Sequence, residues 1–199
     1  HESSRSRAYR TIDCFVTNRS LSTTLLYLVG MTESQAKSLA HIIGAEFEHV
    51  AIAAPRIRDL LPIYLDLLGG KPIWASDNTA YGFRVVCIGY TNGTWHELME
   101  PLHGSAFFDK FFSKRPAGGA HHITFTVKDI DQAQATCEAH GFAIVGRSDE
   151  SPEWKEFFLD LRETSGTLIQ IGESKLKLDH TWTMEQILNG EHGNGIPSP

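Results

Sequence analysis

The sequence predicts an α+β fold in which two β-α-β-β-β modules pair to form one cupped mixed sheet around a cleft. The stretches EFEHVAIAA and GAHHITFTV each place a His, His49 or His122, ahead of a short apolar run. In each module the last strand-like run carries a polar residue beside apolar ones, Glu97 or Gln170. The separation of these two along the chain equals that of the two histidines. This common separation, called the repeat period below, indicates two copies of one supersecondary unit.

The repeat divides the chain into a central domain and two ends. The ends are an N-terminal helical extension at residues 1–45 and a C-terminal tail at residues 175–199. The extension is expected to contain a helix over residues 32–43, with Thr32 as N-cap and Gly44 as its stop. This arm would pack on the core or on a partner subunit; a gate over the cleft is the alternative. The single central domain spans residues 46–174, with module one at 46–102, a linker helix at 103–118 and module two at 119–174.

Each element is predicted from its periodicity and its breakers. Strands are expected where short apolar runs end at Pro, Gly or Asn-Gly, and helices where apolar residues recur at helical spacing. Asp129 is the candidate cap of the second module's helix. The expected strands are residues 47–53, 81–90, 94–99, 123–127, 154–161 and 167–171, with a further one starting within 142–145, and the expected helices are residues 57–68, 105–113, 130–139 and 183–188.

Composition limits the class of protein. The 199 residues are 41% hydrophobic and 21% charged, which is typical of a globular chain. A net charge of −6 without a basic cluster argues against a nucleic-acid partner. No run reaches the roughly 18 apolar residues of a membrane span, so no membrane association is expected. Three cysteines without CxxC spacing argue against a disulfide framework and favour the reducing cytoplasm. Because the sequence starts at His1 and not at Met, removal of a targeting segment remains an alternative.

The cleft is expected to hold a divalent metal ion. If the first and last strands of each module line it, His49, Glu97, His122 and Gln170 converge as two imidazoles, one carboxylate and one amide oxygen. This set carries a charge of about −1, so a bound ion keeps net positive charge and acts as a Lewis acid. Zn, Ni, Co, Mn and Fe are not distinguished.

The neighbours of these ligands are expected to have structural roles. Strand alternation turns His121 and His96 away from a cleft that His122 and Glu97 face. Glu100, three positions after Glu97 at a strand end, is expected to be peripheral.

The pattern resembles the vicinal oxygen chelate superfamily, which includes glyoxalase I, methylmalonyl-CoA epimerases and extradiol dioxygenases. The resemblance covers residues 46–174 and is greatest to the epimerase family. It is carried by the stretches HVAIAAP, HELMEPL, SAFFDKFFSKRPAGGAHHITFTVKDID and SGTLIQIGE.

This sequence departs from the epimerase pattern in two ways. That family usually has His, Gln, His and Glu in order, whereas here Glu97 stands at the Gln position and Gln170 at the Glu position. The family's second acid/base Glu lies on a middle strand of the first module, and Val85 occupies that position here. An overlay of the two modules places Glu156 at the equivalent position of module two. The hypothesis is a mirrored site, in which Glu97 binds metal and takes a proton and Glu156 is the opposite acid/base.

The expected function is metal-dependent isomerisation, either epimerisation through a metal-bound enolate next to a carbonyl or a glyoxalase-type lyase reaction. The substrate would be a small molecule such as a thioester or a 2-oxo compound, and a homodimer is expected. The alternatives are an Fe(II)-dependent dioxygenase and a non-catalytic small-molecule binding or resistance protein of the same superfamily.

Overall fold

A computed structural model describes residues 42–192 of the chain. The helix predicted over residues 32–43 is described only at its end, where Ile42 and Ile43 are helical and Gly44 follows with a φ of +63°. That left-handed conformation is the expected helix stop. The rest of that helix and of the predicted N-terminal extension lies outside the described residues, as do residues 193–199 of the tail.

The elements follow the order β-α-β-β-β twice. In module one, β1 (Glu46–Ala53) leads through the 3-10 turn η1 (Ile57–Leu60) and the π-helical η2 (Pro62–Leu67) to β2 (Lys71–Asn78), β3 (Phe83–Gly89) and β4 (Trp95–Pro101). The short helix α3 (Asp109–Phe112) lies between the modules. In module two, β5 (Gly119–Thr126) leads through α4 (Ile130–Ala139) to β6 (Ile144–Ser148), β7 (Trp154–Leu159) and β8 (Leu168–Ser174), and α5 (Met184–Leu188) follows in the tail.

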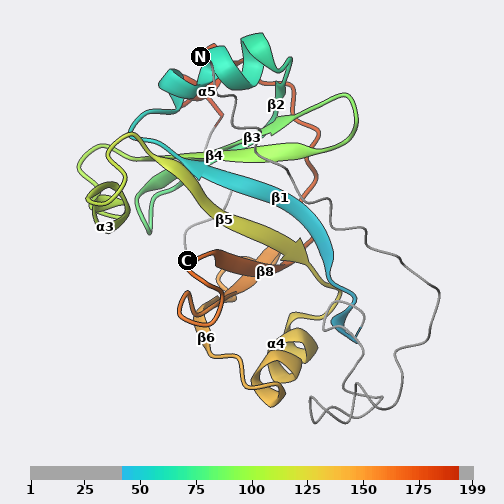
Figure 1. Ribbon diagram of the computed structural model, residues 1–199. Coiled ribbons are helices and arrows are strands. Elements are labelled where there is room, and N and C mark those ends of the chain that lie inside the picture. The colour runs from blue at the N-terminus through green and yellow to red at the C-terminus, as the bar shows by residue number, and fades with distance from the viewer. Residues whose placement is uncertain (1–41, 193–199) are drawn as a thin grey trace, which may run out of the picture. The chain divides into compact units, whose positions relative to one another are not determined.

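The strands form one mixed sheet in the order β2-β3-β4-β1-β5-β8-β7-β6. At its centre β1 and β5 pair antiparallel, and they run side by side in Figure 1. Each also pairs in parallel with the last strand of its own module, in matching register. Val50 lies opposite His96, and one repeat period later Ile123 lies opposite Ile169. A pseudo-twofold axis therefore relates the modules, and the predicted fold class is confirmed.

Strand alternation gives the sheet an inner face that lines the cleft and an outer face that helices cover. On β3, Val85 and Cys87 belong to the inner cluster of buried side chains, whereas Val86 and Ile88 belong to the outer one. In Figure 1, α4 covers the module-two strands, and α5 lies with η1 and η2 on the module-one strands. These helices thus leave the inner face of the sheet free to line the cleft.

Two predicted helices differ from expectation. The helix predicted over residues 57–68 is split at Pro62, where a 3-10 turn gives way to a π-helix. Proline has no N–H to donate and its ring excludes an α-helical carbonyl, so the hydrogen-bond pattern changes at that residue. The linker helix predicted over 105–113 is reduced to the single turn α3, because Phe108 and its neighbours pack individually against the inner cluster.

The helix of the second module lies where the sequence predicts it, whereas the prediction missed one strand of the first module. Helix α4 spans the predicted residues, and the Asp129 carboxylate accepts from the N–H groups of Asp131 and Gln132 at 3.0 and 2.9 Å. Strand β2 has no clear sequence signal, because KPIWASDN combines a proline with polar residues. As an edge strand it tolerates Pro72, which lies at a register shift in its pairing with β3.

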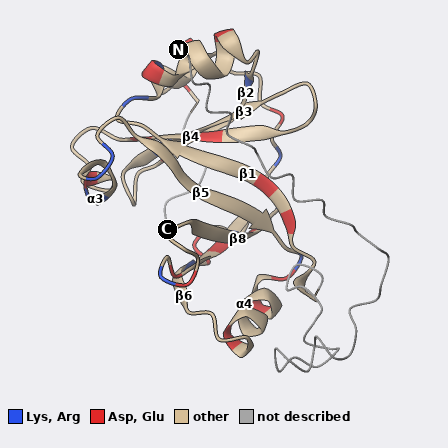
Figure 2. Cartoon of the chain, viewed as in Figure 1, with Lys and Arg blue, Asp and Glu red and all other residues tan. Residues whose placement is uncertain are grey.

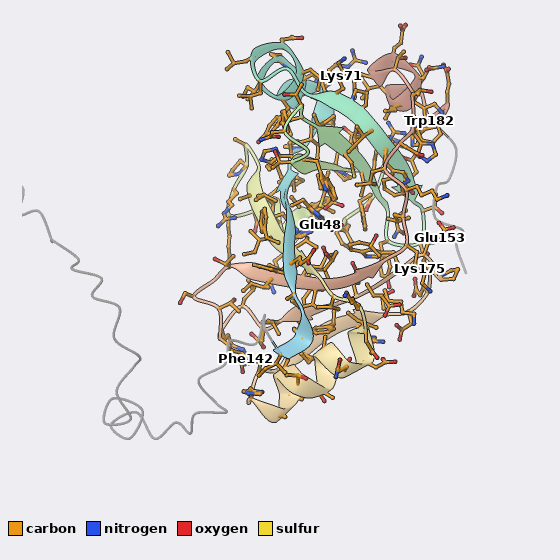
Figure 3. The ribbon with its side chains drawn as sticks, turned by 90° about the vertical axis from the view of Figure 1, so that its right-hand side faces the viewer. Glu48, Lys71, Phe142, Glu153, Lys175 and Trp182 are labelled. Carbon is orange, nitrogen blue, oxygen red and sulfur yellow. The ribbon has the colours of Figure 1, made fainter. Side chains whose placement is uncertain are left out.

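The chain after β8 crosses from module two to module one. The N–H of Lys175 donates to the carbonyl oxygen of Glu153 at 2.8 Å, and the N–H of His180 donates to that of Ile73 on β2 at 2.9 Å. Figure 3 shows this segment running from Lys175, beside Glu153, to Trp182.

Helix α5 is fixed to the outer face by packing and by charge. Ile187 is fully buried in the outer cluster. The Arg84 guanidinium donates to the carbonyl of Leu188 at 3.3 Å and to both carboxylate oxygens of Asp77 at 2.6 and 2.9 Å. Burial alone would raise the pKa of Asp77, but Arg84 and His192 hold it below its ordinary value. The ionised carboxylate therefore stabilises the attachment of the tail to β2 and β3.

Within residues 42–192, no helix has the length and apolar character to span a bilayer. The homodimer and the cytoplasmic location remain predictions.

We expect Asp77→Asn to lower the free energy of unfolding by about 2 kcal/mol at pH 7, because it removes the carboxylate that accepts two hydrogen bonds from the largely buried Arg84. Since the pKa of Asp77 is depressed in the folded protein, its stabilisation is present above about pH 4 and is lost as the pH falls further. Denaturant titrations at pH 7 and pH 3 measure both effects, and the difference between variant and parent should shrink at pH 3. The control is Asp59→Asn, which removes the exposed Arg56–Asp59 pair and should cost less than about 0.5 kcal/mol. Equal losses in the two variants would contradict this account.

Candidate metal centre

Four side chains converge on the inner face because the strands that carry them are neighbours. His49 lies on β1, Glu97 on β4, His122 on β5 and Gln170 on β8, and these four strands form the middle of the sheet. All four residues line one cavity. The structure therefore brings together the complete set that the repeat singles out.

The ligand atoms of His49, Glu97 and His122 form a compact group, all within 4.8 Å of one another. The Oε2 atom of Glu97 is 3.3 Å from Nε2 of His122 and 3.8 Å from Nε2 of His49. Glu97 Oε2 and His122 Nε2 are buried and have no hydrogen-bond partner among the described residues. Buried polar atoms are normally satisfied, so this pair points to a group that would complete the site. Two imidazole nitrogens and a carboxylate oxygen facing one point fit a divalent metal ion.

Gln170 lies beside this group with its amide held at both ends. Its Oε1 accepts from the Thr124 hydroxyl at 2.6 Å, and its Nε2 donates to Glu156 at 2.5 Å. The Thr124 hydroxyl is also 3.0 Å from Nε2 of His49. The Thr124 hydroxyl thus links the amide oxygen of Gln170 to Nε2 of His49.

Each candidate histidine ligand is held at its other ring nitrogen by the residue before it. His49 Nδ1 is 3.1 Å from Glu48 Oε2, and His122 Nδ1 is 2.9 Å from His121 Nδ1. Glu48 and His121 are themselves one repeat period apart. Such contacts orient a histidine so that the opposite nitrogen faces the metal.

The prediction that His121 faces away from the cleft is wrong. Ala51 pairs with His122, but the next residue, Ile52, pairs with Ala120, so His121 is the extra residue of a β-bulge. A bulge interrupts the strict alternation of side chains along a strand. His121 therefore lines the cavity beside His122, and its ring packs against Phe108.

The other two neighbours lie on the outer face, as expected. His96 packs against the rings of Tyr64 and Tyr90. Glu100 accepts from the N–H of Ile57 at 2.7 Å, where it satisfies the start of η1.

The two candidate imidazole ligands have opposite pKa shifts. Burial alone would lower the pKa of His49, but the carboxylates of Glu48 and Glu97 raise it to about 9. Burial lowers the pKa of His122 to about 4, with Glu97 opposing the shift. Burial alone would raise the pKa of Glu97, but His49 and His122 hold it below its ordinary value. The centre thus favours a carboxylate and at least one neutral imidazole, both of which metal ions bind.

Figure 2 shows acidic residues on β1 and β4 and no basic residue on the central strands. The sequences of β4, β1 and β8 contain glutamates, and neither these strands nor β5 contain Lys or Arg. A cation at the centre would therefore meet no Lys or Arg side chain on these four strands, and it would have to displace the proton that the raised pKa of His49 favours.

Glu156 enters the same cavity from β7. Its Oε2 accepts from Trp154 Nε1 at 2.7 Å as well as from Gln170. Burial raises its pKa, and the hydrogen bonds from Trp154 and Gln170 oppose that rise.

Glu156 occupies the position in module two that Val85 occupies in module one. Val85 of β3 lies opposite Met99, and Glu156 lies opposite Gly172, which follows Met99 by one repeat period. The pairing of the strands therefore gives the same equivalence that the overlay of the two sequences implied.

The cavity has a volume of about 340 Å³ and extends from the four converging residues to aromatic and aliphatic side chains. Sequence reasoning missed several residues of the site. Two of them, Glu48 and Thr124, lie one repeat period from His121 and Ala51, so the repeat could have drawn attention to them. The missed lining residues include Trp74, Tyr81, Phe83, Phe107, Arg147, Trp154, Leu176 and Leu178.

Comparisons with known proteins agree with this geometry. A family described as the Glyoxalase/Bleomycin resistance protein/Dioxygenase superfamily matches residues 48–158, more than half of the chain. A mitochondrial methylmalonyl-CoA epimerase of Dictyostelium discoideum is 28% identical over 144 residues, covering 68% of this chain and 84% of the relative. An ethylmalonyl-CoA/methylmalonyl-CoA epimerase of Cereibacter sphaeroides is 30% identical over 126 residues, covering 62% of this chain and 93% of the relative.

Among solved structures, methylmalonyl-CoA epimerase from Mycobacterium tuberculosis superposes with a TM-score of 0.57 at 25% identity, covering 66% of this chain and 89% of the other. A hypothetical protein from Bacillus halodurans superposes with a TM-score of 0.60 at 27% identity, covering 68% and 99%. The paired modules, the converging histidines and these matches lead to one conclusion: the chain belongs to the glyoxalase/bleomycin resistance protein/dioxygenase superfamily.

Proposed function

We propose that this chain is an epimerase that removes and returns a proton on the carbon next to a thioester carbonyl. The observation that carries the proposal is the pair of carboxylates, Glu97 and Glu156, which line one cavity from different modules. One carboxylate can take a proton from one face of a substrate carbon while the other delivers a proton to the opposite face. The relatives that are named methylmalonyl-CoA epimerases support a CoA thioester as the substrate.

The residues His49, Glu97 and His122 would hold one divalent metal ion, with the amide oxygen of Gln170 as a fourth donor. When bound, such an ion supplies Lewis-acid stabilisation of negative charge that develops on carbonyl oxygens. The buried atoms Glu97 Oε2 and His122 Nε2, which have no hydrogen-bond partner in residues 42–192, support this assignment. The donor set suits Zn, Ni, Co, Mn or Fe.

The two carboxylates would have different tasks. Glu97, held ionised by the histidines, would take the proton on the module-one side. Glu156, whose pKa burial raises, holds a proton at higher pH than an exposed glutamate does and would supply it on the module-two side. Trp154 and Gln170 both donate to its Oε2 and so set the orientation of the carboxylate.

One further reaction is favoured by a specific observation. Two histidines and one carboxylate around a common point form the triad that Fe(II) oxygenases use, and His49, His122 and Glu97 provide that triad. A dioxygenase is therefore the alternative. A glyoxalase-type proton shift would use the same donors on a hemithioacetal.

We expect the metal-loaded protein to exchange the α-hydrogen of 2-methylmalonyl-CoA with D₂O without consuming oxygen. NMR or mass spectrometry follows the exchange, and an oxygen electrode runs in parallel. Oxygen uptake with Fe(II) and a catechol would support the dioxygenase instead. Turnover of a hemithioacetal without thioester exchange would support the glyoxalase-type reaction.

We expect Glu48→Gln to weaken metal binding by about 10- to 100-fold, because the amide holds Nδ1 of His49 less strongly than a carboxylate does. Competition with a chromophoric chelator measures the affinity for Zn(II) without any assay of activity. The matched control is Glu46→Gln, an exposed glutamate two residues earlier on the same strand, which should leave the affinity unchanged. His122→Ala should weaken binding further than Glu48→Gln, and an unchanged affinity there would remove His122 from the metal centre.

We expect Glu156→Gln to slow proton exchange by at least about 100-fold. It should weaken metal binding less than Glu48→Gln does, because Glu156 contacts the amide of Gln170 and not an imidazole ligand. Glu97→Gln should reduce both quantities, because that residue is assigned to the metal and to the proton. Glu153→Gln, at an exposed position just before β7, is the control and should change neither. Normal turnover of Glu156→Gln would rule out its acid/base role.

A further inference from the structure

We propose that an apolar branch on the reacting carbon of the substrate lies against the module-one half of the cavity, and that Leu176 and Leu178 of the C-terminal segment limit its length. This inference rests on the proposed function. The surface concerned, called the apolar wall below, consists of Trp74, Val85, Leu176 and Leu178, all of which line the cavity.

The two halves of the cavity differ in chemistry although their backbones are related. At equivalent positions module one carries Val85 and module two carries Glu156. On the module-two side, Arg147 and Ser148 also line the cavity, and Trp154 turns its N–H toward Glu156. The cavity thus has an apolar side chain and a carboxylate at equivalent positions of its two modules, although Ser76 and Asn78 also line it from module one and Phe158 from module two.

The two leucines come from the segment that follows β8. Burial alternates along it: Leu176 and Leu178 are partly buried, whereas Lys175, Lys177 and Asp179 are exposed. This is the pattern of an extended chain with one side facing the protein. Both leucines pack against the inner cluster of module one, which includes Trp74 and Val85.

The segment is held at both ends, so the leucines are a fixed part of the cavity. The hydrogen bond from Lys175 to Glu153 fastens its start to module two, and that from His180 to Ile73 fastens its end to module one. Figure 3 shows its course between Lys175 and Trp182. The apolar wall therefore combines side chains of the sheet with side chains of the tail.

This arrangement sets the orientation of a substrate whose reacting carbon lies between Glu97 and Glu156. An alkyl branch gains by leaving water for the apolar wall, whereas beside Glu156 it would place hydrocarbon against a carboxylate without offering that carboxylate a hydrogen bond. The cavity of about 340 Å³ exceeds the roughly 150 Å³ that accommodates benzene in an apolar cavity. This volume has to hold the malonyl group and its thioester carbonyl as well as the branch, so the position of the apolar wall sets how long the branch can be.

The test compares proton exchange from 2-methyl-, 2-ethyl-, 2-propyl- and 2-butylmalonyl-CoA. The variants Leu176→Ala and Leu178→Ala each remove side-chain volume from the apolar wall. Each should raise the ratio of kcat/KM for the 2-butyl compound to kcat/KM for the 2-methyl compound by at least about 10-fold, since one methylene in an apolar pocket is worth about that factor. Leu178→Phe should lower the same ratio. The matched control is Lys177→Ala, an exposed residue between the two leucines, which should leave the ratio unchanged.

An unchanged ratio in active Leu176→Ala, Leu178→Ala and Leu178→Phe proteins would overturn the inference while leaving the proposed function in place. If the parent protein exchanges the α-proton of none of the thioesters, the proposed function fails. The apolar wall is then tested by ligand binding instead of by proton exchange. Calorimetry with the free 2-alkylmalonic acids and the metal-loaded protein should then still show a shift of preference toward butyl in Leu178→Ala. Absence of that shift would overturn the inference as well. Circular dichroism identifies a variant that fails to fold, in which case Leu178→Val is used and should shift the ratio in the same direction by a smaller factor.

Discussion

The antiparallel pairing of β1 with β5 is the constraint on which the rest of the structure depends. It places the first strands of the two modules side by side, and each of them pairs in parallel with the last strand of its own module. The four strands that carry His49, Glu97, His122 and Gln170 become neighbours only through this arrangement. Because a slip of one residue would turn a strand's side chains to the other face, the register also decides that these residues share one cavity.

Within this symmetric frame, equivalent positions have diverged in charge. His49 and His122 are both buried and both held at Nδ1, but by a carboxylate in one module and by an imidazole in the other. Burial lowers the pKa of both rings. Only His49 has carboxylate neighbours that more than offset burial and bring its pKa to about 9, whereas that of His122 falls to about 4. Equal backbone geometry therefore gives two imidazoles of different basicity.

The same divergence separates the two sides of the cavity. Glu156 and Val85 occupy one structural position in the two modules, so an acid faces an apolar side chain across the pseudo-twofold axis. The C-terminal segment strengthens this difference, because it adds leucines to the apolar side and is fixed to both modules. A symmetric fold thus provides an asymmetric environment, which a reaction that distinguishes two faces of a carbon requires.

The sequence by itself determined the duplicated β-α-β-β-β order and the spacing of the four converging residues, because these follow from the repeat period. It also determined the equivalence of Glu156 with Val85, through an overlay of the two middle strands that departs from the repeat period by two residues. It also predicted α4, whose cap at Asp129 is a local signal. Only the tertiary structure decided the orientation of His121, since a bulge in the β1–β5 pairing overrides alternation. It alone placed the edge strand β2, split the first helix at Pro62 and brought Leu176 and Leu178 into the cavity, because these features depend on contacts between residues far apart in the chain.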